Sequence, residues 1–203
     1  MLSIFLRGLL IGFSIAAPVG PIGLLCIRRT LADGRAIGFV SGLGAATADA
    51  FYGAVAGFGL TVVSRALVQG QTPLRLVGGA FLCYLGVRTF LARPAQAAGV
   101  AGPRGLLGAY LSTLGLTLTN PSTILSFVAI FAGLGLAANA DYGSAFVVVT
   151  GVFIGSASWW IVLAAGAGWL RGRIGPALFR AINIVSGLTI LGFAIWQLAV
   201  ILR

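Results

Sequence analysis

A single acidic residue, Asp49, lies inside an apolar stretch of this sequence. The other two acids, Asp33 and Asp141, fall between such stretches, and the chain contains no Glu or His. Placing a carboxylate at the centre of a membrane helix costs about 2.5–3.5 kcal/mol. An Asn or Ser would make a purely structural hydrogen bond between helices at lower cost. We therefore predict that Asp49 binds a substrate amino group, carries a coupling proton, or does both in competition.

Two proline-containing interruptions lie in other apolar stretches. The first is Pro18-Val19-Gly20-Pro21 and the second is Asn120-Pro121. A proline inside a helix removes a backbone N–H and frees carbonyl groups that hydrocarbon cannot satisfy. Such backbone is stable at membrane depth only where protein covers it or where it lines a wet cavity. A plain kink between packed helices is the alternative, but paired breaks in two halves of a chain favour a binding site.

Polar side chains gather beside the second break and in a later apolar stretch. Hydroxyl groups in membrane helices usually bond to carbonyls of their own helix, so each is individually expected to be structural. As a group at one depth with Asp49, they could line a hydrophilic pocket. The predicted substrate-binding set is Asp49, Pro18, Gly20, Pro21, Asn120, Pro121, Thr123 and Ser158, with Ser122, Ser126 and Ser156 nearby.

The elements that must position these residues are membrane helices. Of the 203 residues, 59% are hydrophobic and only 8% are charged, and the mean hydropathy is +1.08. A soluble domain carries about 25% charged residues, so lipid must act as the solvent of this chain. We predict a single membrane domain, 1–203, with six spans: Leu2–Ile27, Ala36–Val63, Leu74–Ala92, Leu106–Leu136, Tyr142–Leu170 and Ala177–Leu202.

The basic residues indicate how the spans are oriented. All thirteen are arginines, the net charge is +10, and they occur singly or in pairs between the apolar stretches. That placement is typical of topology determinants, and no basic face for nucleic acid is present. The side of the first, third and fifth connections carries nine arginines, and the side of the two termini carries four. Because positive residues stay in the cytoplasm, both termini are predicted to lie outside. The nine are Arg28, Arg29, Arg35, Arg88, Arg93, Arg104, Arg171, Arg173 and Arg180, and the four are Arg7, Arg65, Arg75 and Arg203.

The two halves of the chain resemble each other weakly. With three spans in each half, about 1–92 and 104–203, the second half starts on the opposite side of the membrane, so similarity implies an inverted repeat. Ser41-Gly42 aligns with Thr150-Gly151, which places Asp49 opposite Ser158. The predicted fold is an all-α integral membrane protein of six helices in two inverted three-helix repeats. Helices 1 and 4 are expected to be broken near the midplane.

Several classes of function are disfavoured by what the sequence lacks. It has no GxxxxGK[ST] loop for ATP, and its two cysteines, Cys26 and Cys83, are isolated, so no metal cluster is expected. One buried carboxylate without His cannot build a nucleophile, base and acid. We predict that the chain is not an enzyme and uses no cofactor. Glycines spaced by four indicate close helix packing, within the chain or in a homo-oligomer.

The segment Ala17–Pro21, the glycine-rich second span with Asp49, and Asn120-Pro121 resemble the LysE/RhtB superfamily of amino-acid exporters. The resemblance covers essentially the whole chain. It implies an efflux protein of the bacterial inner membrane for amino acids or related small metabolites, driven by ion gradients. The Pro-Gly-Pro element of the family maps onto Pro18, Gly20 and Pro21 with a valine inserted. Its Asn-Pro-Lys element maps onto Asn120 and Pro121, but Ser122 replaces the lysine.

Three functions are compatible with these features of the sequence. The leading hypothesis is a secondary exporter of an amino acid or similar small solute, coupled to protons by antiport through Asp49. A divalent-metal exporter, related to distant branches of the superfamily, would need several oxygen ligands, usually with more than one carboxylate, and the spans offer one. A membrane scaffold without substrate is the third, and it predicts dry proline breaks with no polar cavity between the halves.

Overall fold

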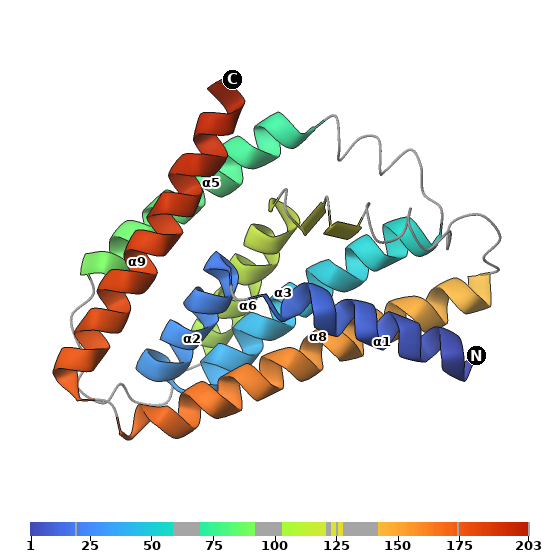
Figure 1. The fold of residues 1–203 in the computed structure, drawn as a ribbon, viewed down its shortest axis with the longest axis horizontal. Helices are drawn as coiled ribbons and strands as arrows, with labels where there is room; N and C mark the ends of the chain where they lie inside the picture. Colours follow the sequence, from blue (N-terminus) through green and yellow to red (C-terminus); the bar gives the residue numbers. More distant parts are fainter. Residues whose placement is uncertain are drawn as a thin grey trace.

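The computed structural model describes residues 1–18, 20–58, 70–91, 103–120, 123–124, 126–127, 142–173 and 175–202. All regular structure in these ranges is helical (Figure 1). The helices are α1 Leu2–Ala16, α2 Pro21–Asp33, α3 Arg35–Gly57, α5 Gln71–Leu91, α6 Pro103–Leu118, α8 Tyr142–Arg171 and α9 Pro176–Ala199, followed by a short 3-10 turn, Val200–Leu202.

The first predicted span is broken where its prolines lie. Helix α1 ends at Ala16, α2 begins at Pro21, and the two helices are bent by 80° relative to each other. Proline suits the first position of a helix because an N–H group at that position makes no hydrogen bond within the helix. Helix α2 continues past the predicted end at Ile27 and stops before Gly34, whose φ of 106° is one that glycine adopts readily.

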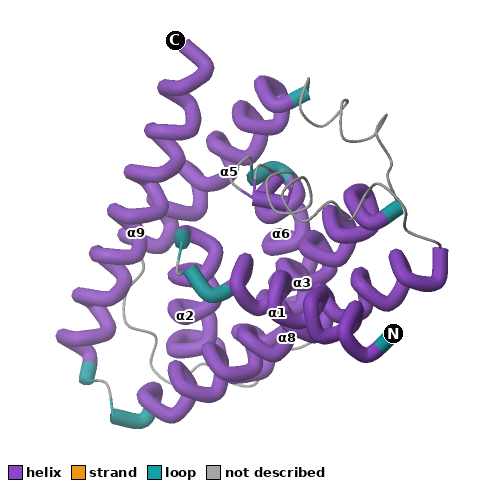
Figure 2. The backbone as a smooth tube through the Cα atoms, turned by 45° about the vertical axis from the view of Figure 1, so that its right-hand side comes forward, coloured by secondary structure: helices purple, strands orange, loops and turns teal. Residues whose placement is uncertain are grey.

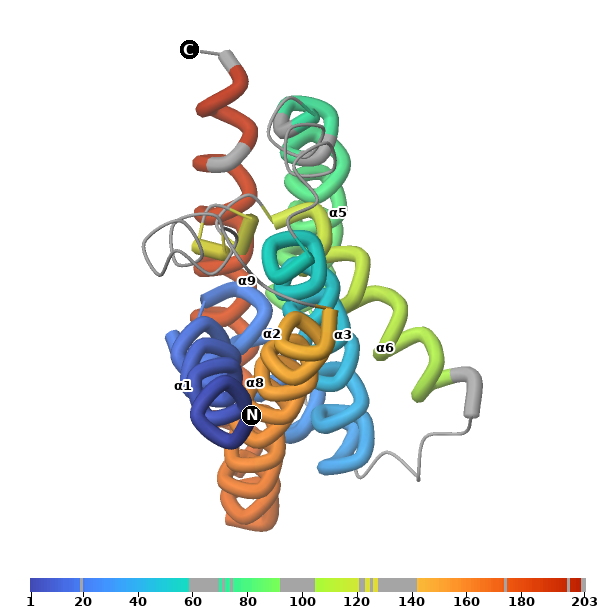
Figure 3. Tube along the Cα trace, turned by 90° about the vertical axis from the view of Figure 1, so that its right-hand side faces the viewer, coloured from blue at the N-terminus to red at the C-terminus, as the bar shows by residue number. Residues whose placement is uncertain are grey.

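Four helices form a layer in the order α1, α8, α3 and α6, each packed against the next (Figure 3). Helices α5 and α9 pack along each other as a separate pair (Figure 2). Helix α2 connects the two groups, because it contacts α3 and α8 of the layer and α9 of the pair. The break between α1 and α2 therefore lies where the layer meets the remaining helices.

Glycines allow α1 and α8 to approach closely. Gly8 and Gly12 of α1 lie against the backbone of α8, and Gly151 and Gly155 of α8 lie against the backbone of α1. A Cβ atom at any of the four would overlap backbone atoms of the facing helix. The spacing of four noted in the sequence thus forms a contact within one chain. A homo-oligomer stays a prediction.

Helix α3 is the most enclosed element of the layer. Thirteen of its 23 residues are buried. Gly38 faces α2, Gly42 faces Trp160 of α8, and Gly44 faces the backbone of α6. Small residues on three sides let three neighbours pack tightly around α3, and this carries Asp49 into the interior.

Among the described residues, two helices, α8 and α9, are each long and apolar enough to cross a membrane alone, and α1 with α2 can form a third span as a bent pair. Helix α6 is apolar but has only 16 residues. Helices α5, α8 and α9 begin and end within a few residues of the predicted third, fifth and sixth spans. The ends of the predicted second and fourth spans lie outside the described residues, so six spans in two inverted repeats stay a prediction.

Candidate substrate-binding site

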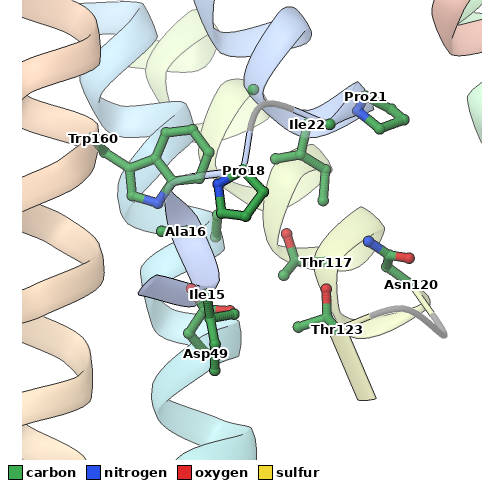
Figure 4. Close-up of a pocket in the computed structure, with 13 residues that line it drawn as sticks. Ile15, Ala16, Pro18, Pro21, Ile22, Asp49, Thr117, Asn120, Thr123 and Trp160 are labelled. Atoms are coloured by element: carbon green, nitrogen blue, oxygen red, sulfur yellow. The ribbon is translucent and has the colours of Figure 1, made fainter. Parts of the chain in front are cut away.

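A cavity of about 90 Å³ lies where the break between α1 and α2 meets α3, α6 and α8 (Figure 4). One water needs roughly 10–15 Å³ of such space, so the cavity has room for several waters or a small solute. The walls of this cavity include residues of the first break, residues at the start of the second break, and Asp49. The predicted site residues that line it are Pro18, Gly20, Pro21, Asp49, Asn120 and Thr123.

Asp49 is held by a short chain of hydrogen bonds. Its side chain is only 3% exposed, and its Oδ2 accepts a hydrogen bond from Ser156 Oγ at 2.7 Å. Trp160 Nε1 donates to the same Ser156 Oγ at 3.2 Å. Trp160 also lines the cavity, on the same side as Asp49 in Figure 4. Two residues of α8 thus fix the orientation of the acid at the cavity wall.

The amino end of α2 forms another wall of the cavity. Gly20, Pro21, Ile22 and Gly23 line it, and no side chain of a described residue caps this end of the helix. The first N–H groups of a helix have no partner within the helix, and the helix dipole makes this end attractive to anions. Pro21 has no N–H, so the groups left for a ligand or water are those of Ile22 and Gly23.

The opposite wall comes from the end of α6 and the turn after it. Thr117, Asn120 and Thr123 lie on this side in Figure 4. The Asn120 carbonyl accepts a hydrogen bond from the Thr123 N–H at 3.1 Å, which shapes the turn. Tyr52 of α3 donates its hydroxyl to the Leu118 carbonyl and anchors the end of α6. The wall therefore offers hydroxyl and amide groups, and Asp49 is the only acid among the described lining residues.

One described residue of the predicted site, Ser158, lies away from the cavity. Ser158 is not among its lining residues, and its Oγ donates to the Ile154 carbonyl of its own helix at 2.7 Å. The α8 hydroxyl that contacts Asp49 belongs to Ser156 instead. Pro121 lies outside the described residues. Thr117 was missed by the sequence reasoning, although it lies one helical turn before Asn120 and that spacing could have indicated it.

A second polar network ties α2 to its neighbours at the other end of that helix. The Arg29 guanidinium donates to Ser41 Oγ at 3.0 Å, the Ala109 carbonyl at 3.1 Å, Thr113 Oγ1 at 2.9 Å and Ser112 Oγ at 2.8 Å. These acceptors belong to α3 and α6. The sequence reasoning treated Arg29 as a topology determinant, whereas the structure shows that it also links three helices inside the protein.

The chain is similar in sequence to known membrane transport proteins over most of its length. The sequence profile of the LysE type translocator family matches residues 13–200. The chain is 28% identical over 200 residues to "Putative amino acid efflux protein YcgF" of Bacillus subtilis (strain 168), covering 96% of this chain and 95% of that protein. It is 29% identical over 149 residues to "Uncharacterized membrane protein YahN" of Escherichia coli (strain K12), covering 68% and 63% of the two chains. No solved structure matches it. Since the family profile spans both breaks and Asp49, the chain belongs to the LysE type translocator family and is a multi-pass membrane transporter.

Proposed function

We propose that this transporter exports a small amino acid or a related zwitterionic metabolite from the bacterial cytoplasm in exchange for protons. The observation that carries the proposal is one small cavity with Asp49 on one wall and the uncapped amino end of α2 on another. An amino acid bears an ammonium group and a carboxylate a few bonds apart. An anionic side chain and a group of free N–H donors are complementary to those two charges.

Asp49 provides the coupling in this proposal. Its carboxyl group can hold a proton or pair with the substrate ammonium, but protonation removes the negative charge on which the ion pair depends. A proton arriving from outside therefore displaces the substrate outward. Loss of that proton to the cytoplasm restores the carboxylate for the next substrate. Ser156 donates to Oδ2 and so stabilises the ionised, substrate-binding form.

The substrate carboxylate is assigned to the first break rather than the second. The N–H groups of Ile22 and Gly23 are available at the start of α2, and the helix dipole favours an anion there. The second break offers the Asn120 amide and the Thr123 hydroxyl, which are neutral. The replacement of the family's lysine by Ser122 leaves that break without a cation of its own.

Alternating access follows from the proposed inverted repeats. Among the described helices, the four most extensively packed pairs are α1 with α8, α6 with α3, α3 with α8, and α5 with α9. Exchanging each first-half helix with its second-half counterpart (α1 with α6, α3 with α8, α5 with α9) reproduces the same set. This supports two halves related by a pseudo-two-fold axis, which rock around a central site. The arginine distribution supports both termini outside.

The cavity also favours a transporter over a membrane scaffold without substrate. A scaffold needs no polar space at its proline breaks, and the lining by Asp49, Thr117, Asn120 and Thr123 would be costly there without a polar occupant. In an exporter, a polar substrate would occupy this cavity and satisfy its polar lining.

Ligand binding tests the proposed function directly. Thermal unfolding of the purified protein is measured with each amino acid, with amines that lack a carboxylate, and with carboxylic acids that lack an amino group. Ligand at 100 times its Kd stabilises a folded protein by about 2.7 kcal/mol. We expect a rise in Tm with one or a few amino acids and a smaller rise with the single-group analogues.

Two variants provide the controls for this screen. Asp49→Asn should abolish the shift, whereas Ser158→Ala, on the same helix as Ser156 but away from the cavity, should preserve it. If no amino acid raises the Tm, or if Asp49→Asn responds as the unaltered protein does, the proposed function is wrong.

A further inference from the structure

A second, larger cavity lies between α2 and α5. Its volume is about 560 Å³, within the range of about 300–1,000 Å³ that is typical of small-molecule sites. None of its lining residues lines the first cavity. An inference drawn from it is therefore independent of the proposed amino-acid transport.

The charged lining of this cavity is predominantly cationic. Arg28, Arg29 and Arg88 line it together with a single acid, Asp33. Arg29 already makes four hydrogen bonds to α3 and α6, so it contributes charge from a fixed position. Arg88 is exposed, and its Nη1 donates to Tyr84 on the same helix at 3.1 Å. The excess of two positive charges favours an anionic occupant.

Two polar atoms at the cavity are buried without a hydrogen-bond partner among the described residues. They are Arg28 Nε and Thr89 Oγ1, and Thr89 is only 1% exposed. A buried donor without a partner is unfavourable unless a ligand or water satisfies it. Thr89 differs in this from six other threonines inside helices, which donate to the carbonyl four residues earlier: Thr30, Thr47, Thr113, Thr117, Thr150 and Thr189.

One side of the cavity is apolar and reaches the outer surface of the helix bundle. Val87 and Leu91 line it and are 46% and 62% exposed. Helix α5 coincides with the predicted third span, and exposed valine and leucine on such a span are expected to face acyl chains. A soluble anion would match only the arginine side of the cavity, whereas a lipid with an anionic headgroup would match both sides.

The cavity also lies at the depth expected for headgroups. Arg171 at the end of α8 donates to the Ala32 carbonyl near the end of α2 at 3.0 Å, so these two arginine-bearing ends are adjacent. Arg173 stacks over the ring of Trp169 nearby, and tryptophan is enriched at membrane interfaces. This end is the one predicted to face the cytoplasm, where anionic lipids attract basic residues.

We propose that the cavity between α2 and α5 binds the phosphate group of an anionic phospholipid. Arg28, Arg88 and Thr89 donate hydrogen bonds to the phosphate oxygens, and the acyl chains run along Val87 and Leu91. Because the lipid contacts both α2 and α5, it fastens the α5–α9 pair to the rest of the bundle.

Thermal unfolding of the full-length, delipidated protein in detergent tests the proposal. The probes are dioctanoyl phosphatidylglycerol, dioctanoyl phosphatidylcholine and glycerol phosphate. We expect phosphatidylglycerol to raise the Tm at concentrations where the other two have little effect. Arg28→Gln and Arg88→Gln should each weaken this response roughly five-fold, as expected for one basic residue at an anionic headgroup. Thr89→Val, which keeps the side-chain shape, should weaken it in the same direction.

The matched control is Arg173→Gln, which removes a positive charge at the same end of the molecule but outside the cavity. It should retain the full response. An equal response to phosphatidylcholine would show that the phosphate site is not selective for anionic lipid, and an equal response to glycerol phosphate would assign the site to a soluble anion. Either result, or an unchanged response in Thr89→Val and the arginine variants, overturns the proposal.

Discussion

Asp49 combines deep burial with a position on the wall of a cavity. The hydrogen bond from Ser156 occupies one acceptor position of the carboxylate oxygen Oδ2. A carboxylate has about four acceptor positions, so the group can still receive a proton or a substrate ammonium. The same side chain can therefore be held in place and take part in exchange.

Ser156 and Ser158 provide a matched test of this arrangement. Ser156→Ala leaves Asp49 Oδ2 and Trp160 Nε1 without their shared partner, and we expect it to lower the free energy of unfolding by about 1–3 kcal/mol. Ser158→Ala removes only a bond to its own helix and should change it by less than about 0.5 kcal/mol. Denaturant unfolding in detergent measures both; equal effects would contradict the assigned contact.

The sequence indicated Asp49 and the prolines because their cost in a membrane depends on residue type alone. It could not distinguish Ser156 from Ser158, since that choice depends on how α8 is rotated against α3. Helix α8 is apolar on all sides, so its sequence marks no inward face. The alignment of the two halves placed Ser158 opposite Asp49, but in an inverted repeat alignment does not specify contact.

At the scale of elements, close packing of α1 on α8 positions the break next to Asp49. Gly8, Gly12, Gly151 and Gly155 bring the two backbones together. The sequence spacing predicted close packing, but it did not identify the partner helix, because glycine pairs occur in several spans.

Two glycines of α8 test whether this contact is required. Gly155→Ala places a methyl group against the Leu9 carbonyl, so the helices must separate, and we expect a loss of stability of about 1–3 kcal/mol. Gly166→Ala meets no atom of another described segment within 4 Å and should be neutral or stabilising by up to about 1 kcal/mol, because alanine favours helix. The Tm values of the two variants are compared. Similar values would contradict the tight α1–α8 contact.

The arginines near the end of α2 show that the position of a basic residue in the sequence does not establish its role. Their position between apolar stretches is that of topology determinants, yet Arg29 points inward to α3 and α6. Sequence distribution cannot separate the two roles, because an arginine near a helix end can reach either headgroups or neighbouring backbone.

At the scale of the whole molecule, the arginine distribution predicts that both termini face outward. Alkaline phosphatase fused to the C-terminus should be active, whereas green fluorescent protein in its place should not fluoresce after export through the general secretory route. A fusion at Gly172, between α8 and α9, should give the reverse result. A fluorescent C-terminal fusion would contradict the predicted orientation.

In the proposed mechanism, Asp49 couples proton entry to amino-acid exit through the cavity at the broken helices. Proteoliposomes are loaded with labelled amino acid identified by the binding screen, and efflux is followed with and without a proton gradient directed into them. We predict that the gradient accelerates efflux and that Asp49→Asn eliminates this acceleration. Efflux by Asp49→Asn that responds to the gradient as the unaltered protein does would contradict this mechanism.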